Sequence, residues 1–247
     1  MRSSAATLVV LSVLGATTLA WDNTPPIPDR LPGAGLELGK GGASIDIEII
    51  YDLGCPTCKA EHPEIMKLLD LPFLTGKVSD AITMRFAFSP LTWHHGAWTL
   101  TKMIPYMSDL CYFDATKCGL FKDYIAFAFA QQDWIIVSTK MSESALIANW
   151  TQTVATKMKL DVNELRNLYD NGKDTHKSER RTRDSYDYTM GRTVGGTPSA
   201  FVNGVKIQKI PANAQDWLKL ITDVINSQTK LTMEEQQEMI RNYRFLE

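Results

Sequence analysis

The chain has 247 residues, of which 44% are hydrophobic and 22% charged, and its formal net charge is −2. These values are typical of a globular protein, and the length allows one elaborated domain with a sizeable core. The sequence contains no block of like charge and no basic stripe interleaved with aromatic residues. We therefore expect no nucleic-acid partner.

The first twenty residues have the pattern of a secretory signal peptide. Arg2 supplies a short positive segment, residues 8–14 form an apolar run, and small residues precede a cleavage site after Ala20. A membrane anchor is the alternative, but this run is shorter than the roughly 20 apolar residues that span a bilayer. We expect a protein without a membrane anchor after cleavage of residues 1–20, located in the secretory-pathway lumen or secreted. On that route Asn149, in an Asn-Trp-Thr sequon, is a candidate glycosylation site.

Two strands and one helix are predicted in the next part of the chain. Residues 21–43 are rich in proline and glycine and indicate an extended, poorly ordered leader. Alternating apolar residues predict strands at 44–52 and 81–88, and apolar residues at core spacing predict a helix at 56–71. Pro56 would occupy the first helical turn, where its missing N–H is not needed.

The pattern then becomes helical. Between about residues 95 and 192 no clear strand pattern occurs, and amphipathic stretches predict a helical insert of about five elements. The strand pattern returns at 199–202. Asn203-Gly204 is the dipeptide favoured in two-residue hairpins, so residues 205–207 are the predicted partner strand.

The C-terminal region completes the predicted domain. A helix is expected at 213–225, which gives a domain over residues 44–228, and a short helical tail follows at 229–247. Strands that alternate with helices, followed by a hairpin, predict an α/β fold with a mixed sheet.

The motif Cys55-Pro56-Thr57-Cys58 lies at the junction between the first strand and the first helix. A helix N-terminus carries free N–H groups and a partial positive charge, both of which stabilise a thiolate and lower its pKa. The thiolate is the species that attacks a disulfide. We therefore predict that Cys55 is the catalytic nucleophile and that Cys58, one helical turn further on, resolves the mixed disulfide.

Three other interpretations of this cysteine pair stay open. Cys55 and Cys58 have the spacing of zinc ligands, and Cys111 and Cys118 could supply two more, although that second spacing is longer than is typical of structural zinc sites. The pair could also be a structural disulfide, which stabilises little in so short a loop. The third interpretation is two buried cysteines without chemistry. We favour the redox pair and expect no metal.

A second motif, Gly-Gly-Thr-Pro-Ser-Ala-Phe-Val-Asn-Gly, occupies residues 195–204. Thr197-Pro198 before a strand, and Phe201 before the Asn-Gly hairpin, resemble the corresponding segment of the DsbA-like branch of the thioredoxin-fold oxidoreductases. The resemblance implies a cis peptide bond before Pro198 and a loop that packs against the active-site cysteines. It also implies that the loop backbone pairs with the substrate chain, which makes Thr197 and Pro198 candidate substrate-binding residues. An ordinary trans proline that opens a strand is the alternative.

The resemblance extends over residues 44–225. Segments 51–58 and 88–94 are similar to the strand ends of DsbA-like proteins, and Pro63 matches the proline that kinks the first helix of thioredoxin folds. A helical insert before the Thr-Pro loop is typical of the same branch. The implied structure is a thioredoxin-like fold, with a mixed central sheet flanked by helices and a large helical insert before the cis-proline loop.

Cys111 and Cys118 form a second cysteine pair in the sequence. In an oxidising compartment two spare cysteines usually pair, so we predict a structural disulfide between Cys111 and Cys118 at the turn between two insert helices. The alternative is a second redox pair that passes electrons to the Cys55–Cys58 motif.

Several other residues have both a functional and a simpler structural interpretation. We predict that His62 is a surface or packing histidine rather than a proton carrier, and that Glu61 is exposed rather than a proton acceptor for Cys58. His94 and His95 are adjacent and on a helix would point apart, so we do not expect a chelating pair. Six aromatic residues are predicted to belong to the core, namely Trp93, Trp98, Phe121, Phe127, Phe129 and Trp134.

These observations predict a thiol–disulfide oxidoreductase that acts on protein or peptide thiols and disulfides. It would need no cofactor beyond its own redox-active disulfide. The direction of exchange and the oligomeric state stay open. The alternatives are a secreted thioredoxin-fold binding module without redox turnover, and a glutathione-linked transferase or peroxidase.

Overall fold

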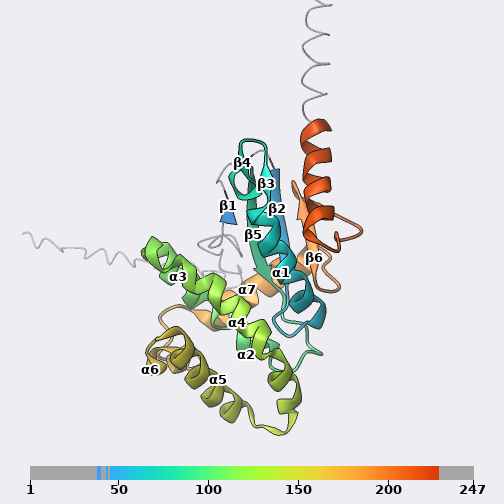
Figure 1. The fold of residues 1–247 in the computed structure, drawn as a ribbon. Helices are drawn as coiled ribbons and strands as arrows, with labels where there is room; N and C mark the ends of the chain where they lie inside the picture. The colour runs from blue at the N-terminus through green and yellow to red at the C-terminus, as the bar shows by residue number, and fades with distance from the viewer. Residues whose placement is uncertain (1–37, 40–42, 44, 228–247) are drawn as a thin grey trace, which may run out of the picture.

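The structure is a computed structural model that describes residues 38–39, 43 and 45–227. The predicted signal peptide, most of the leader and the helical tail lie outside the described residues. The chain forms a five-stranded mixed sheet in the order β1-β5-β2-β6-β7, flanked by helices (Figure 1). Its strands are β1 (Leu38–Gly39), β2 (Ile45–Tyr51), β5 (Ile82–Phe88), β6 (Ser199–Val202) and β7 (Val205–Lys206), and a separate small hairpin consists of β3 (Pro72–Phe73) and β4 (Gly76–Lys77).

The helices account for most of the remaining described chain. They are α1 (Pro56–Asp70), α2 (Ala97–Thr101), α3 (Ile104–Phe113), α4 (Cys118–Val137), α5 (Glu143–Met158), α6 (Val162–Asn167), α7 (Ser178–Gly191) and a last helix at 214–227. Short 3-10 helices lie at Val78–Asp80, Ala115–Lys117 and Ser138–Lys140. The predicted helices at 56–71 and 213–225 are therefore confirmed.

The central strand β2 is buried on both faces of the sheet. It runs parallel to β5, from the pair Ile45–Ile82 to the pair Tyr51–Phe88, and antiparallel to β6. Five consecutive residues, 47–51, are buried because helices cover both faces, as is typical of a strand inside an α/β sheet. The strands predicted at 44–52 and 81–88 agree with β2 and β5.

Each face of the sheet has its own helices. On one face Ile49 of β2 packs in the main core with Ile65 of α1, and the helix at 214–227 lies beside α1 (Figure 1). On the other face Ile50 packs with Val194, just after α7. The Ser185 hydroxyl of α7 donates to the Phe88 carbonyl oxygen at 2.8 Å, which ties α7 to the end of β5.

The leader and the insert differ from the sequence predictions in detail. Residues 38–39, assigned to the leader, pair with β5 as strand β1. Residues 95–192 contain six α-helices rather than about five. The extra helix arises because two residues separate the end of α2 from the start of α3. Pro105, in the first turn of α3, favours a new helix start there.

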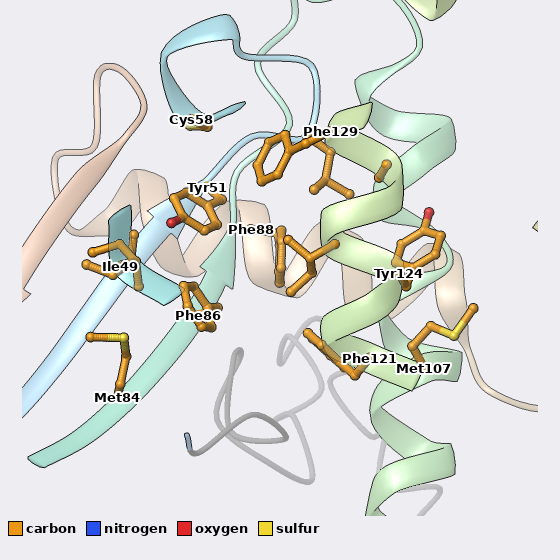
Figure 2. Close-up of a cluster of buried hydrophobic side chains, with 14 of the residues drawn as sticks. Ile49, Tyr51, Cys58, Met84, Phe86, Phe88, Met107, Phe121, Tyr124 and Phe129 are labelled. Atoms are coloured by element: carbon orange, nitrogen blue, oxygen red, sulfur yellow. The ribbon is translucent and has the colours of Figure 1, made fainter. Parts of the chain in front are cut away.

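The insert is joined to the sheet by an aromatic core (Figure 2). Tyr51 and Phe86 stack with 5.2 Å between ring centroids, and Phe129 of α4 meets Tyr51 edge-on at 5.5 Å. Phe121, two turns earlier in α4, lies 6.3 Å from Phe88. Helix α4 therefore packs the insert against the end of the sheet at which β2 and β5 terminate.

The prediction that Trp93 belongs to the core is wrong. The Trp93 side chain is 65% exposed, because it lies in the loop between β5 and α2 rather than on a core-facing helix. Phe121 and Phe129 are buried in the core, and Phe127 and Trp134 pack against it while partly exposed. Trp98 is partly exposed outside this cluster, and its indole N–H donates to the Glu179 carboxylate at 3.1 Å.

The Asn-Gly hairpin forms as predicted. Asn203 and Gly204 both have positive φ, 48° and 80°, which is the backbone shape of the tight two-residue turn between β6 and β7. The Asn203 side-chain oxygen also accepts a hydrogen bond from the Asp46 N–H at 2.8 Å. The turn thereby fixes where β6 ends against β2.

The predicted pairing of Cys111 with Cys118 is confirmed. The bond joins the end of α3 to the first residue of α4. Asn149 lies on an exposed position of α5, and its glycosylation stays a prediction. In the part of the chain that the structure describes, no helix is both long enough and apolar enough to cross a bilayer.

We expect replacement of both Cys111 and Cys118 with serine to lower the free energy of unfolding by about 2–3 kcal/mol. A bond between cysteines seven positions apart removes about this much entropy from the unfolded chain. Urea unfolding under non-reducing conditions measures the change. A double variant that keeps its stability but loses thiol exchange would instead favour the second redox pair.

Candidate active site

Cys55 lies at the N-cap of α1, directly after β2. The chain leaves the strand in a tight turn, in which the Cys55 N–H donates to the Asp52 carbonyl at 3.0 Å. The Gly54 N–H donates to the Asp52 carboxylate at 2.7 Å. Pro56 then begins the helix without losing a hydrogen bond. Local sequence therefore directs the Cys55 side chain to the start of α1.

The two thiols of the motif are free and lie in different surroundings. Cys55 is 4% exposed and has the exposed residues Pro56 and Thr57 beside it. Cys58 is 0% exposed, one turn into α1, and belongs to the main core above Tyr51 (Figure 2). Both thiols are therefore buried, but Cys55 lies directly below exposed residues and Cys58 lies deeper in the core.

The Thr197-Pro198 segment lies against Cys55, although the two are 142 positions apart in the chain. The Cys55 thiol donates to the Thr197 carbonyl oxygen at 3.2 Å. The Thr197–Pro198 peptide bond is cis, as the resemblance implied. The fold thus brings the Thr-Pro segment, which leads into β6, into contact with the Cys-x-x-Cys motif.

Hydrogen bonds hold the pKa of the Cys55 thiol at about 5, well below that of a free cysteine. The largest contribution is a hydrogen bond with Cys58, and burial opposes it. Contact with Thr197 and hydrogen bonds from the backbone of Cys58 and Thr57 lower the pKa further. Cys55 is therefore a thiolate at neutral pH.

Cys58 behaves in the opposite way. Burial raises the pKa of its thiol strongly, and the hydrogen bond to the Cys55 sulfur and the negative charge there raise it further. At neutral pH the pair thus consists of one thiolate and one thiol that donates to it. This asymmetry assigns attack to Cys55 and leaves Cys58 to act second.

Buried titratable side chains follow Cys58 on α1. Glu61 is only 8% exposed and accepts a hydrogen bond from the Trp217 indole N–H at 2.9 Å, so the prediction that it is exposed is wrong. The helix at 214–227 covers it. His62 is 5% exposed, its ring lies 5.3 Å from that of Phe129, and burial lowers its pKa to about 4. The predicted packing role of His62 agrees with these contacts.

The sequence analysis missed one pair next to the motif, Asp52 and His94. The Asp52 side chain is 0% exposed, and its carboxylate lies 2.5 Å from His94 Nδ1. An aspartate two residues before a glycine at the end of a strand is a signal for a side-chain-capped turn. Its histidine partner is 42 positions away and carries no such signal.

The two adjacent histidines do not lie on a helix, because α2 begins only at Ala97. His94 and His95 both line a groove of about 640 Å³ between residues 90–99, the start of α5 and α7. Of the two, His94 is the one bonded to Asp52 through Nδ1.

The zinc interpretation of the cysteines is not supported. Cys111 and Cys118 are bonded to each other and cannot complete a four-cysteine site with the Cys55–Cys58 pair. Within the described residues, no three or more His, Cys, Asp or Glu side chains are grouped so that they could hold a metal ion.

Comparison with known proteins agrees with the geometry. No family model matches the sequence, and no curated protein matches it. Among solved structures, BdbD of Bacillus subtilis matches with a TM-score of 0.54 at 19% identity, covering 77% of this chain and 92% of that one. The fold is DsbA-like. The thiol-disulfide exchange protein alpha-DsbA2 of Wolbachia pipientis (TM-score 0.52, 16% identity, 75% and 84% covered) is also similar. So is the oxidoreductase NmDsbA1 of N. meningitidis (TM-score 0.51, 15% identity, 84% and 91% covered).

We expect the alkylation rate of Cys55 in the reduced protein to rise with pH around a midpoint near 5, because only the thiolate reacts. Iodoacetamide labelling across pH 3–9 measures it. The Cys58→Ala variant, which loses the hydrogen-bond donor, should have a clearly higher midpoint. Cys58→Ser keeps a hydroxyl donor and should lie between the two. A wild-type midpoint near 8.5 would contradict the described site.

Stability should fall as pH drops from about 6.5 to about 4. Burial lowers the folded-state pKa of His62 to about 4, whereas the unfolded chain binds this proton near pH 6.5. The unfolded state therefore binds more protons in this window, which can cost up to roughly 3 kcal/mol. Urea unfolding at pH 7 and pH 4.5 should show a smaller loss in His62→Leu than in the wild type and in the control His95→Gln. Equal losses in all three would contradict the assignment.

Proposed function

We propose that this protein is a thiol–disulfide oxidoreductase acting on protein or peptide cysteines. The observation that carries the proposal is the Cys55 sulfur at the start of α1, 3.2 Å from the Thr197 carbonyl oxygen, with the pKa of its thiol held near 5. The buried Cys58 thiol beside it supplies the second sulfur that disulfide exchange needs. The DsbA-like fold supports the same activity.

The favoured direction is oxidation of substrate thiols. A stabilised Cys55 thiolate stabilises the reduced enzyme, and an enzyme whose reduced form is stabilised is a strong oxidant. In the oxidised enzyme, a substrate thiolate attacks Cys55 Sγ, a mixed disulfide forms and Cys58 leaves as a thiolate. Because burial raises the pKa of Cys58, this sulfur then takes up a proton.

The second step releases the product. A second substrate thiolate attacks the substrate sulfur of the mixed disulfide, and Cys55 leaves as a thiolate. Two electrons pass to the enzyme, and the substrate gains one disulfide. The low pKa makes Cys55 a good leaving group, so no metal or organic cofactor enters either step.

The substrate backbone is proposed to lie along residues 195–198. Gly195 and Gly196 have open space where a Cβ atom would be, so another chain can approach the backbone closely there. The segment leads directly into β6, and an extended peptide can add to such a segment by main-chain hydrogen bonds. Thr197 and Pro198 would thereby place the substrate cysteine beside Cys55.

The place of action is proposed to be an oxidising compartment. Residues 1–20 have the pattern of a signal peptide, and the Cys111–Cys118 bond is of a kind that persists outside the reducing cytosol. Asn149, whose position on α5 is exposed, would be accessible to glycosylation on that route.

We expect Cys55→Ser to abolish oxidative refolding of a reduced disulfide-containing substrate, because the remaining free thiol, Cys58, is buried, keeps its proton and has no partner with which to form the redox disulfide. Reduced Cys58→Ser should accumulate mixed disulfides on non-reducing gels when it meets an oxidised substrate, because Cys55 then attacks the substrate disulfide and no Cys58 thiol is present to displace the substrate from Cys55. The Cys111→Ser/Cys118→Ser double variant serves as the control and should remain active.

Other outcomes identify the alternatives. Equal refolding rates with the wild type and Cys55→Ser would refute the oxidoreductase and favour a binding module. Exchange that proceeds only through a glutathione adduct on Cys55 would favour a glutathione-linked transferase or peroxidase.

A further inference from the structure

We propose that Asp52 and His94 are positioning residues of the thiol centre, which hold the turn 52–55 so that Cys55 meets the start of α1 and Thr197. This inference rests on the proposed function and names residues that the exchange would depend on without their touching the substrate. Neither residue belongs to the Cys-x-x-Cys motif or to the Thr-Pro loop.

The Asp52 carboxylate organises two loops at once. Oδ1 accepts a hydrogen bond from the Gly54 N–H at 2.7 Å, inside the turn that delivers Cys55. Oδ2 accepts one from the Leu91 N–H at 3.0 Å and lies 2.5 Å from His94 Nδ1, in the loop after β5. One buried side chain therefore joins the cysteine turn to a loop about 40 positions away.

A carboxylate that is 0% exposed needs such partners. Removing a carboxylate from water is costly, and burial raises the pKa of Asp52 while its hydrogen bonds with His94, Gly54 and Leu91 oppose the rise. Of these partners only His94 is a side chain that can carry a positive charge, and its side chain is 19% exposed. Loss of His94 would leave the buried carboxylate with backbone donors alone, and the carboxylate would take up a proton or shift.

Gly54 provides a second, independent observation. A Cβ atom at Gly54 would lie 2.7 Å from His94 Cβ, 3.1 Å from Ala97 Cβ and 3.3 Å from Asp52 Oδ1. The φ angle of Gly54 is not positive, so backbone conformation does not require glycine at this position. The requirement is the close approach of His94, which packs directly against the residue before the nucleophile.

The consequence for Cys55 is geometric. Its thiolate is stabilised by the Cys58 thiol and by backbone donors of Thr57 and Cys58 at the start of α1, and these act only if the sulfur is correctly placed. The turn sets that placement, because the Cys55 N–H is itself bonded to the Asp52 carbonyl at 3.0 Å. A looser turn would therefore lower the stability of the thiolate without changing either cysteine.

The test compares two substitutions of His94. His94→Asn keeps an N–H donor at the position of Nδ1, whereas His94→Leu has a similar size and no donor. The pH dependence of Cys55 alkylation and the equilibrium with glutathione redox buffers are measured for both. His95→Leu, which changes the neighbouring histidine of the same groove, is the matched control.

We expect His94→Leu to raise the alkylation midpoint of Cys55 by about one pH unit, the size expected for the loss of one hydrogen bond. Its glutathione equilibrium constant should shift by about tenfold toward the oxidised enzyme. His94→Asn should recover most of both changes, and His95→Leu should match the wild type. Gly54→Ala, which pushes His94 away through the new Cβ, should shift both readings in the same direction as His94→Leu.

The inference is overturned if His94→Leu lowers only the melting temperature and leaves the midpoint and the glutathione equilibrium unchanged. It is also overturned if His94→Asn is as impaired as His94→Leu. Failure of the proposed function looks different, because the wild type itself would then show no exchange. If His94→Leu does not fold, Gly54→Ala and His94→Asn still decide the question through the same two readings.

Discussion

The thiol centre depends on one constraint, which is that the carboxyl end of β2 must bring a sulfur to the start of a helix. The neighbours of β2 supply the rest. Because β5 is parallel to β2, its loop with His94 emerges at the same edge of the sheet. Because β6 is antiparallel, it begins at that edge, and Ser199 pairs with Ile50 just after Thr197. Strand direction alone therefore brings together three segments that are far apart in the sequence.

The same arrangement separates the properties of the two cysteines. Cys55 lies where helix donors are unsatisfied, and Cys58 lies one turn deeper, against the aromatic core between the sheet and α4. The helical insert thus does more than enlarge the domain, because α4 contributes Phe129 to that core and Gln132, whose amide donates to the Leu53 carbonyl at 3.0 Å. The apolar surroundings keep the inner sulfur protonated while the outer one is charged.

Short-range patterns were sufficient for most of the framework. The alternation in β2 and β5, proline at the start of α1 and the Asn203-Gly204 turn each depend on residues that are neighbours in the chain, and each prediction agreed with the structure. The failures share a different cause. Glu61 is buried by Trp217, which is 156 positions away, and no local pattern reveals such a cover. The Asp52–His94 contact was missed for the same reason.

The β6–β7 end of the sheet has a consequence for solubility. An exposed strand edge offers unpaired N–H and C=O groups to any other chain, and this leads to edge-to-edge aggregation. Here the outer strand β7 is only two residues long, and one of them is a lysine whose amine donates to the Thr193 carbonyl at 2.8 Å. A short, charged edge is a poor template for another strand. The exchange proposed above would bring partly unfolded chains to the segment beside Cys55, and the short β7 edge would offer them little backbone with which to co-aggregate.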